Sequence, residues 1–292
     1  MTTVDTTLRT GRRRRESPLQ GPSKLGAVLT VIVLGVFTLL PIYWLIVTSL
    51  TPDGDAFTFP PRFWPKHLTL HAFTTFFGNS QLTTYFVNSV VVTVAAAVIA
   101  IVVSSYCAYS LSKFRYRGRT AIAYFVLSTQ LFPSTLLVIA LYLLFNSYHL
   151  LNSYFAIILS YSTFTLPLCV FILKNYFDTI PDELIEAAKL DGASQLAIIH
   201  RIILPVAKPG LVAAGLFAVI RSWNDFIIAL TLAGPKTMTL PPGLVLTYLT
   251  QDQSSWPGLM AASLIVSLPV IVLFLFFQRH LTSGITAGSI KG

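Results

Sequence analysis

The sequence predicts an all-α integral membrane protein with six transmembrane helices and a cytoplasmic helix-turn-helix loop between helices 4 and 5. Composition is the first observation, because 54% of the 292 residues are hydrophobic and 11% are charged. A soluble domain carries about 25% charged residues. The second observation is six apolar segments, each near the ~20 residues that a helix needs to cross the hydrocarbon core. A membrane barrel would show ~10-residue stretches of alternating polarity instead.

The predicted spans cover residues 25–50, 86–111, 120–145, 153–173, 210–234 and 258–278. Prolines fall inside four of them, and membrane helices tolerate proline because neighbouring helices satisfy the freed carbonyl groups. We therefore expect kinks within a bundle at Pro41, Pro133, Pro167 and Pro269. Residues 1–24, which are rich in Arg, Thr, Ser and Gly, predict a flexible cytoplasmic tail, and residues 25–292 form the transmembrane domain.

The positive charge is distributed unevenly across the predicted topology. If the N-terminus is cytoplasmic, 16 of the 20 Lys and Arg residues lie inside and three lie outside. This asymmetry follows the positive-inside rule, so both termini are expected in the cytoplasm of a multi-pass cell-membrane protein. The run Arg12–Arg15 is also compatible with nucleic-acid binding, but no basic stripe is interleaved with aromatic residues. No nucleic-acid partner is expected.

The loops have distinct compositions. The outer loop at 51–85 is rich in Pro, Phe and Thr and is long enough to form a small cap, while the outer loop at 235–257 shows no further pattern. The inner loop at 112–119 is short and basic, which is typical of a turn held at the lipid headgroups.

The inner loop at 174–209 departs from the apolar pattern and predicts two short helices. Thr179 and Asp182 have capping-box spacing with Pro181 between them, so a helix is expected to begin there. Gly192 suits the end of that helix because glycine accepts a left-handed conformation. Ser194 is expected to cap a second helix that Pro205 ends.

The composition of this loop admits two interpretations. An amphipathic helix pair lying on the membrane would place Asp182, Glu183 and Glu186 against anionic lipid, which is unfavourable. A docking surface is favoured, because Ala187 and Ala188 allow another backbone to approach closely and the neighbouring acids can pair with a partner's basic groups.

The same loop resembles the EAA loop of ABC importer permeases. The resemblance rests on seven positions within residues 179–206: Glu186, Ala187, Ala188, Gly192, Ile202, Leu204 and Pro205. The stretch SWNDF at 222–226 and the ending GITAGSIKG at 284–292 are similar to the six-span subunit of maltose-type carbohydrate permeases. This resemblance implies that the seven positions couple the membrane helices to a cytoplasmic ABC ATPase dimer.

The resemblance also implies the other partners. They are a second permease subunit, an extracytoplasmic binding protein that delivers the substrate, membrane lipid, and a sugar or small oligosaccharide. The sequence contains no G-x-x-x-x-G-K-[ST] phosphate loop and no motif of a hydrolase or metalloprotease. We therefore expect no catalytic residue, metal or cofactor on this chain, and we expect ATP and Mg²⁺ on the partner ATPase.

Charged and amide side chains inside the spans are candidates for the translocation pathway. Arg221 and Asp225 are four residues apart in the fifth span, where an unpaired charge costs ~2.5–3.5 kcal/mol, so we expect them to pair within the bundle. Both a pathway role and a structural ion pair remain open. Asn224 lies between Arg221 and Asp225 and is a further candidate. Asn88, Gln130 and Gln251 are weaker candidates, since an interhelical hydrogen bond explains each of them equally well.

The sequence thus predicts the permease subunit of an ABC importer for carbohydrate. A polyol or glycerol phosphate is the alternative substrate, and a stand-alone secondary carrier is the alternative from another class. A secondary carrier would have no use for the EAA loop. The resemblance assigns much of the substrate selectivity to the binding protein, so the sequence leaves the individual sugar open.

Overall fold

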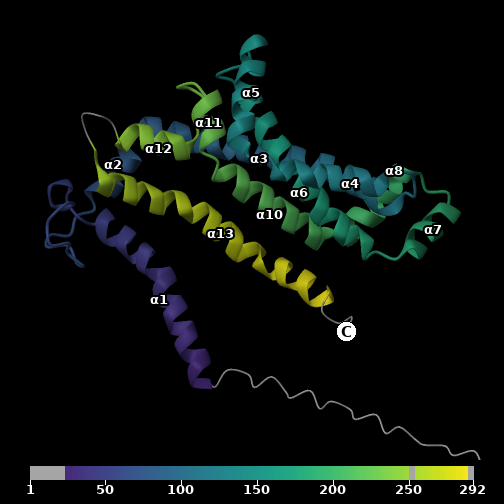
Figure 1. Ribbon diagram of the computed structural model, residues 1–292, viewed down its shortest axis with the longest axis horizontal. Coiled ribbons are helices and arrows are strands. Elements are labelled where there is room, and N and C mark those ends of the chain that lie inside the picture. The colour runs from purple at the N-terminus through teal and green to yellow at the C-terminus, as the bar shows by residue number, and fades with distance from the viewer. Residues whose placement is uncertain (1–23, 250–253, 289–292) are drawn as a thin grey trace, which may run out of the picture. The chain divides into compact units, whose positions relative to one another are not determined.

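The computed structural model describes residues 24–249 and 254–288, which form helices joined by turns (Figure 1). The predicted tail therefore lies outside the described residues, except for Lys24. The described α-helices of four or more residues are α1 (Lys24–Ser49), α2 (His71–Gly78), α3 (Ser80–Lys113), α4 (Arg119–Ser128), α5 (Ser134–Ser147), α6 (Tyr154–Asp178), α7 (Asp182–Leu190), α8 (Gln195–Ile198), α10 (Lys208–Trp223), α11 (Ile227–Leu232), α12 (Leu240–Tyr248) and α13 (Trp256–Gly288).

The fold class is confirmed as all-α with several membrane-crossing helices. Four described helices, namely α1, α3, α6 and α13, are long and apolar enough to cross a membrane. The number rises to six if each of two bent helix pairs forms one span. The described residues before and after the boundary between Trp44 and Leu45 fall into two separate units, so α1 is described by itself. It is a continuous apolar helix that runs through Pro41.

The centre of the larger unit is the contact among α3, α6 and α10, which lie side by side (Figure 1). Small residues allow this approach, since Ala100, Ala214 and Ala218 are fully buried within it. Small side chains let membrane helices pack at close range, where van der Waals contact drives association. Trp223, the last residue of α10, donates from its indole to the carbonyl of Val266 and so joins α10 to α13.

The third predicted span is broken. α4 is followed by a 3₁₀ turn at Thr129–Leu131, and α5 begins at Ser134 after a bend of 94°. Pro133 explains the break, because it has no N–H to donate and it forces the preceding residue into an extended conformation. Phe132 has this conformation, with ψ of 127°. Pro167 and Pro269, in contrast, lie inside the continuous helices α6 and α13.

The fifth predicted span is also broken, so the expectation of one helix over 210–234 was wrong. α10 ends at Trp223, and α11 restarts at Ile227. The side chain of Asp225 accounts for the restart, because its Oδ1 accepts hydrogen bonds from the backbone N–H groups of Ile228 (3.0 Å) and Ala229 (3.4 Å). These are unpaired donors of the first turn, and a capping carboxylate satisfies them.

The two predicted outer loops meet in one cluster of buried side chains. Phe76 of α2 and Tyr85 of α3 pack with Leu240 and Leu244 of α12, so the cap over 51–85 is built jointly with the loop at 235–257. Ser255 also donates to Asp53 at 2.6 Å. The sequence pattern gave no sign of α12, because its glycine and two prolines are typical of a turn. This cluster and the α7–α8 segment lie at opposite ends of the bundle (Figure 1).

Candidate functional site

The first part of the site is α7, which follows α6 after a short turn. α7 begins at Asp182 with Pro181 before it, so the predicted start at Thr179 was wrong. The Thr179 hydroxyl donates to the carbonyl of Tyr176 at 2.7 Å and thereby completes the end of α6. Acidic residues at the first turn of α7, Asp182 and Glu183, favour helix formation there because the helix N-terminus carries partial positive charge.

Gly192 forms the corner between α7 and α8. Its φ is +78°, the left-handed conformation that the sequence predicted. The chain then turns back, with the N–H of Gly192 bonded to Lys189 O (3.0 Å) and that of Ala193 bonded to Ala188 O (2.9 Å). Ser194 caps α8 as expected, because its hydroxyl accepts from the N–H of Ala197 at 3.3 Å.

The second helix does not end at Pro205 as predicted. α8 continues into a π-helical turn at Ile199–Ile203 and a last turn at Leu204–Val206. Pro205 has no N–H and so cannot donate to the carbonyl four residues earlier. The turn before it is π-helical, with the N–H of Leu204 donating to the carbonyl of Ile199. The chain bends by 81° between this segment and α10.

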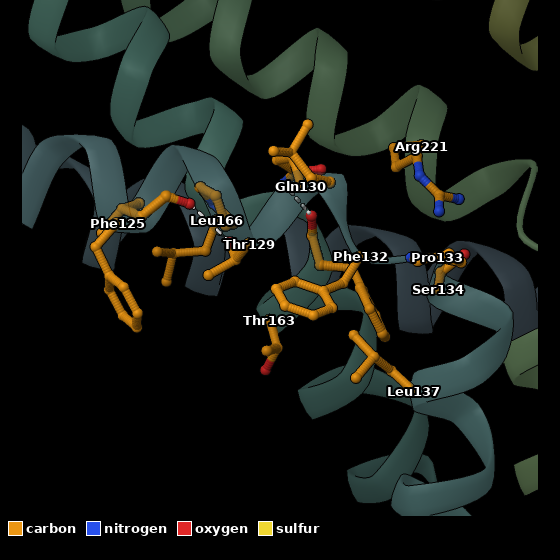
Figure 2. Close-up of a pocket in the computed structure, with 14 residues that line it drawn as sticks. Phe125, Thr129, Gln130, Phe132, Pro133, Ser134, Leu137, Thr163, Leu166 and Arg221 are labelled. Atoms are coloured by element: carbon orange, nitrogen blue, oxygen red, sulfur yellow. Dashed lines mark hydrogen bonds between the residues drawn. The ribbon is translucent and has the colours of Figure 1, made fainter.

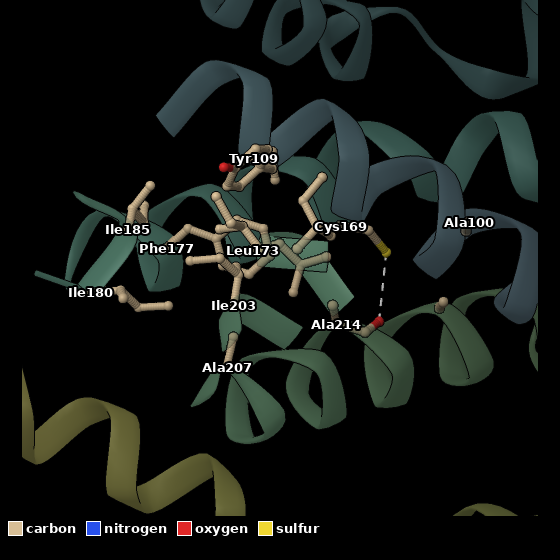
Figure 3. Close-up of a cluster of buried hydrophobic side chains, with 14 of the residues drawn as sticks. Ala100, Tyr109, Cys169, Leu173, Phe177, Ile180, Ile185, Ile203, Ala207 and Ala214 are labelled. Atoms are coloured by element: carbon tan, nitrogen blue, oxygen red, sulfur yellow. Dashed lines mark hydrogen bonds between the residues drawn. The ribbon is translucent and has the colours of Figure 1, made fainter. Parts of the chain in front are cut away.

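One face of the α7–α8 segment is anchored in the bundle. Ile185 and Ala188 of α7 and Ile198, Ile199 and Ile203 of the following helix are buried in a cluster with α3, α6 and α10 (Figure 3). The spacing of three residues between Ile185 and Ala188 places both on the inner face. Ala188 therefore does not lie on the exposed surface, contrary to our expectation that it would line a docking surface.

Other positions of the α7–α8 segment are exposed and carry apolar side chains. Leu190 is 89% exposed, Leu196 is 61% exposed, and Leu184 is 45% exposed. Glu186 and Ala187 are also exposed. Among the remaining EAA positions, Ile202 and Leu204 are partly buried against the cluster, and Pro205 is exposed. Exposed apolar side chains that gather on a segment outside the membrane helices are compatible with a surface that binds a partner.

Lys113, the last residue of α3, joins this segment to the bundle, and sequence reasoning missed it. Its ammonium donates to the Ile180 carbonyl and, at 2.7 Å, to the Asp182 carboxylate. The Lys113 side chain is only 7% exposed. Its hydrogen bond lowers the pKa of Asp182 below the ordinary value, so the carboxylate is ionised at neutral pH. The sequence did contain a sign of this contact, because the basic inner loop at 112–119 and the acidic start of the loop at 174–209 were both predicted on the cytoplasmic side.

The second part of the site is the Arg221–Asp225 pair, which the structure brings together as predicted. Arg221 Nη1 lies 3.5 Å from Asp225 Oδ2. The Asp225 side chain is 8% exposed and also caps α11, whereas the Arg221 side chain is 40% exposed. The pair is therefore asymmetric, with Asp225 held in the protein and Arg221 facing open space.

That space is a cavity of about 560 Å³ beside the break between α4 and α5 (Figure 2). Arg221 and Gln130 line it together with Phe132, Ser134 and Thr163. Gln130 Nε2 donates to the Phe164 carbonyl at 3.1 Å, which leaves its amide oxygen free to accept from the cavity. The sequence indicated Gln130 and Arg221 but not that they share one cavity, since this depends on the bend at Pro133.

The remaining pathway candidates lie elsewhere. Asn88 is buried and donates to the carbonyl groups of Lys236 and Met238, both at 2.9 Å, and accepts from Tyr154 at 2.7 Å. It therefore joins α3 to the outer loop. Asn224 is exposed and donates to the Ile220 carbonyl at the end of α10. Gln251 lies outside the described residues.

The described residues thus form a bundle of membrane-crossing helices with an exposed helical corner at one end and a cavity at a broken helix, an arrangement compatible with a transport permease subunit. Residues 100–287 match the family model described as binding-protein-dependent transport system inner membrane component. The chain belongs to this family.

Relatives match along almost the whole chain. It is 35% identical to the inner membrane ABC transporter permease protein YcjP of Escherichia coli (strain K12), over 92% of this chain and 97% of that protein. It is 32% identical to the diacetylchitobiose uptake system permease protein DasC of Streptomyces coelicolor, over 90% and 96% respectively. The fold matches a chain in the crystal structure of a bacterial ABC transporter involved in the import of the acidic polysaccharide alginate, with a TM-score of 0.75 and 23% identity. The match covers 89% of this chain and 98% of that chain.

The two roles of Asp225 predict different effects for two substitutions. Asp225→Asn keeps an oxygen that can cap α11 but removes the charge, whereas Asp225→Ala removes both. We expect Asp225→Ala to be less stable than Asp225→Asn by about 1 kcal/mol, the usual contribution of an N-cap. Thermal unfolding of the purified protein in detergent measures the difference. Equal stability of the two variants would show that Asp225 acts only through its charge.

Proposed function

We propose that this chain is the permease subunit of an ABC importer for a sugar or small oligosaccharide. An extracytoplasmic binding protein delivers the substrate, a second permease subunit completes the pathway, and a cytoplasmic ATPase dimer supplies the energy. The exposed α7–α8 corner carries this proposal. A stand-alone carrier has no need for an apolar surface that is held rigidly outside the membrane bundle.

The geometry of the corner supports docking of an ATPase. Leu184, Leu190 and Leu196 supply exposed apolar area, and Glu186 and Ala187 lie on the same exposed segment. The buried face is fixed to three membrane helices through the cluster of Ile185 and Ile203. A movement imposed on the corner is therefore transmitted to the bundle through packed side chains. The Lys113–Asp182 contact extends this connection to α3.

A carbohydrate substrate is supported by the resemblance to maltose-type permeases and by the relatives. The Streptomyces coelicolor relative is named for diacetylchitobiose uptake. A polyol or a glycerol phosphate offers hydroxyl groups too and remains the alternative substrate class. The cavity favours an uncharged solute over a phosphate, because Asp225 already balances the charge of Arg221.

Reconstitution tests the proposal directly. The chain, its partner permease, the ATPase and the binding protein are placed in proteoliposomes and offered labelled trehalose, maltose, diacetylchitobiose and glycerol phosphate. We expect uptake of at least one sugar that requires both ATP and the binding protein. Uptake that continues without ATP and without the ATPase would contradict the proposal and favour a secondary carrier.

The corner at Gly192 predicts a graded effect of substitution. A Cβ atom there meets nothing within 4 Å, so the cost of a side chain comes from the backbone conformation alone. Valine is strongly disfavoured at positive φ, whereas asparagine is tolerated. We expect Gly192→Val to retain membrane insertion but lose the co-purifying ATPase, and Gly192→Asn to retain most of it. Normal ATPase recovery with Gly192→Val would contradict the role of the corner.

The proposed topology places both termini and the α7–α8 corner in the cytoplasm. Single cysteines at Lys66 and Glu183, in a chain with Cys107 and Cys169 replaced by alanine, test this orientation. Both positions are exposed. A membrane-impermeant thiol reagent added to spheroplasts should modify Lys66→Cys alone. Modification of Glu183→Cys in intact spheroplasts would show that the orientation is the reverse of the proposed one.

A further inference from the structure

The cavity beside Arg221 lies where two helices of the bundle are interrupted. Phe132, Pro133 and Ser134 belong to the break between α4 and α5, and Arg221 stands in the last turn of α10 before its break (Figure 2). Irregular backbone at membrane depth is tolerated only where it is buried in protein or lines a water-filled cavity. Because these residues line a cavity of about 560 Å³, the break is compatible with an aqueous pathway.

The size and chemistry of the cavity suit a small hydroxylated ligand. Small-molecule sites are typically about 300–1,000 Å³, with mostly apolar walls and a few polar groups. Here the walls include Phe125 and Phe132, and the polar groups include Thr163 and Gln130. Arg221 adds a guanidinium with five N–H donors, of which the 3.5 Å contact with Asp225 engages one nitrogen. Sugar hydroxyls need both donors and acceptors, and the cavity offers both.

The charge of the site argues for a neutral ligand. The Asp225 carboxylate compensates Arg221, and a smaller void of about 10 Å³ next to the pair is lined by Tyr161 and Ser222, which are neutral. An anionic sugar would have to compete with Asp225 for the guanidinium. A neutral sugar can instead accept hydrogen bonds from Arg221 without separating the pair.

We propose that this chain itself contains a transient binding site for a neutral sugar, formed by Arg221, Gln130 and Thr163 with Phe132 as an apolar wall. This inference rests on the proposed function and adds a substrate contact inside this subunit. Asp225 is a positioning residue in the site, because it orients Arg221 and caps α11 without lining the 560 Å³ cavity.

Uptake through matched variants tests the contact. Thr163 and Thr84 are both exposed, and each hydroxyl donates to the carbonyl four residues earlier, at 2.8 and 3.0 Å. Only Thr163 lines the cavity. With saturating binding protein and trehalose, maltose or diacetylchitobiose, Thr163→Val and Gln130→Leu should each lower the sugar moved per ATP by about threefold to tenfold, the effect of one lost hydrogen bond. Thr84→Val should match the unmodified chain.

The outcomes of this assay separate the two proposals. If the unmodified complex moves none of the sugars, the proposed function fails. If it moves sugar and all three variants behave alike, the proposed function stands and the site in this subunit is overturned.

A second measurement tests the charge of the cavity without transport. In the cysteine-replaced chain, Thr163→Cys and Thr84→Cys are each treated with an anionic and a cationic thiosulfonate of similar size. The ratio of the two rates should agree at both positions within about twofold, because the Arg221–Asp225 pair is neutral. Adding Asp225→Asn should raise the anionic preference at Thr163→Cys alone, by about threefold or more. A strong anionic preference at Thr163→Cys with Asp225 intact would overturn the assignment of a neutral ligand.

Discussion

The region around the break between α10 and α11 depends on the two interactions of the Asp225 carboxylate. One oxygen caps α11 and the other lies 3.5 Å from the guanidinium of Arg221. Without the cap, α11 would begin with unpaired N–H groups on the buried residues Ile228 and Ala229, and an unpaired buried N–H group is costly. The break in the fifth span is therefore possible because an acidic residue occupies it. The same residue also keeps Arg221 at the wall of the cavity.

α10 connects the two parts of the candidate site. It runs from Lys208 to Trp223, which corresponds to about 24 Å of helix. Its residues from Leu211 to Val219 contribute to the cluster that anchors the α7–α8 corner, and Arg221 in its last turn lines the cavity. A continuous helix transmits displacement along its axis, because its backbone hydrogen bonds resist local deformation. The structure thus provides a direct mechanical route from the exposed corner to the proposed sugar contacts.

Much of the fold could be predicted from the sequence, because lipid imposes simple rules on composition. The lengths of the apolar segments indicated the helices. The positive φ of Gly192 could be predicted because this glycine follows a short amphipathic segment. The breaks were harder to predict, since Pro133 interrupts its span whereas Pro167 does not. A proline alone does not determine this outcome. The neighbouring helices decide whether the freed carbonyl group finds a partner.

In the candidate site, too, contacts between residues close in sequence could be predicted, whereas contacts between distant residues could not. The Arg221–Asp225 pair has helical spacing, so the sequence could predict it, whereas Lys113 contacts Asp182 across 69 positions of the chain. Asn88 had the same appearance as Gln130, an amide within an apolar segment, yet it holds the outer loop while Gln130 lines the cavity. Residue type defined what each amide could bind. Only the tertiary fold determined whether protein atoms or open space lay beside it.

The exposure of an apolar side chain likewise has different meanings in different parts of the molecule. Leu190 and Phe132 are both largely exposed, at 89% and 65%. Phe132 lies in a broken membrane span and lines the cavity, so the exposure of its ring gives no evidence of a protein partner. Leu190 lies on a helix with two acidic residues in its first turn, beyond the end of α6, where lipid is not the expected solvent. An exposed leucine therefore indicates a protein partner at the corner, whereas the cavity is assigned from its polar groups.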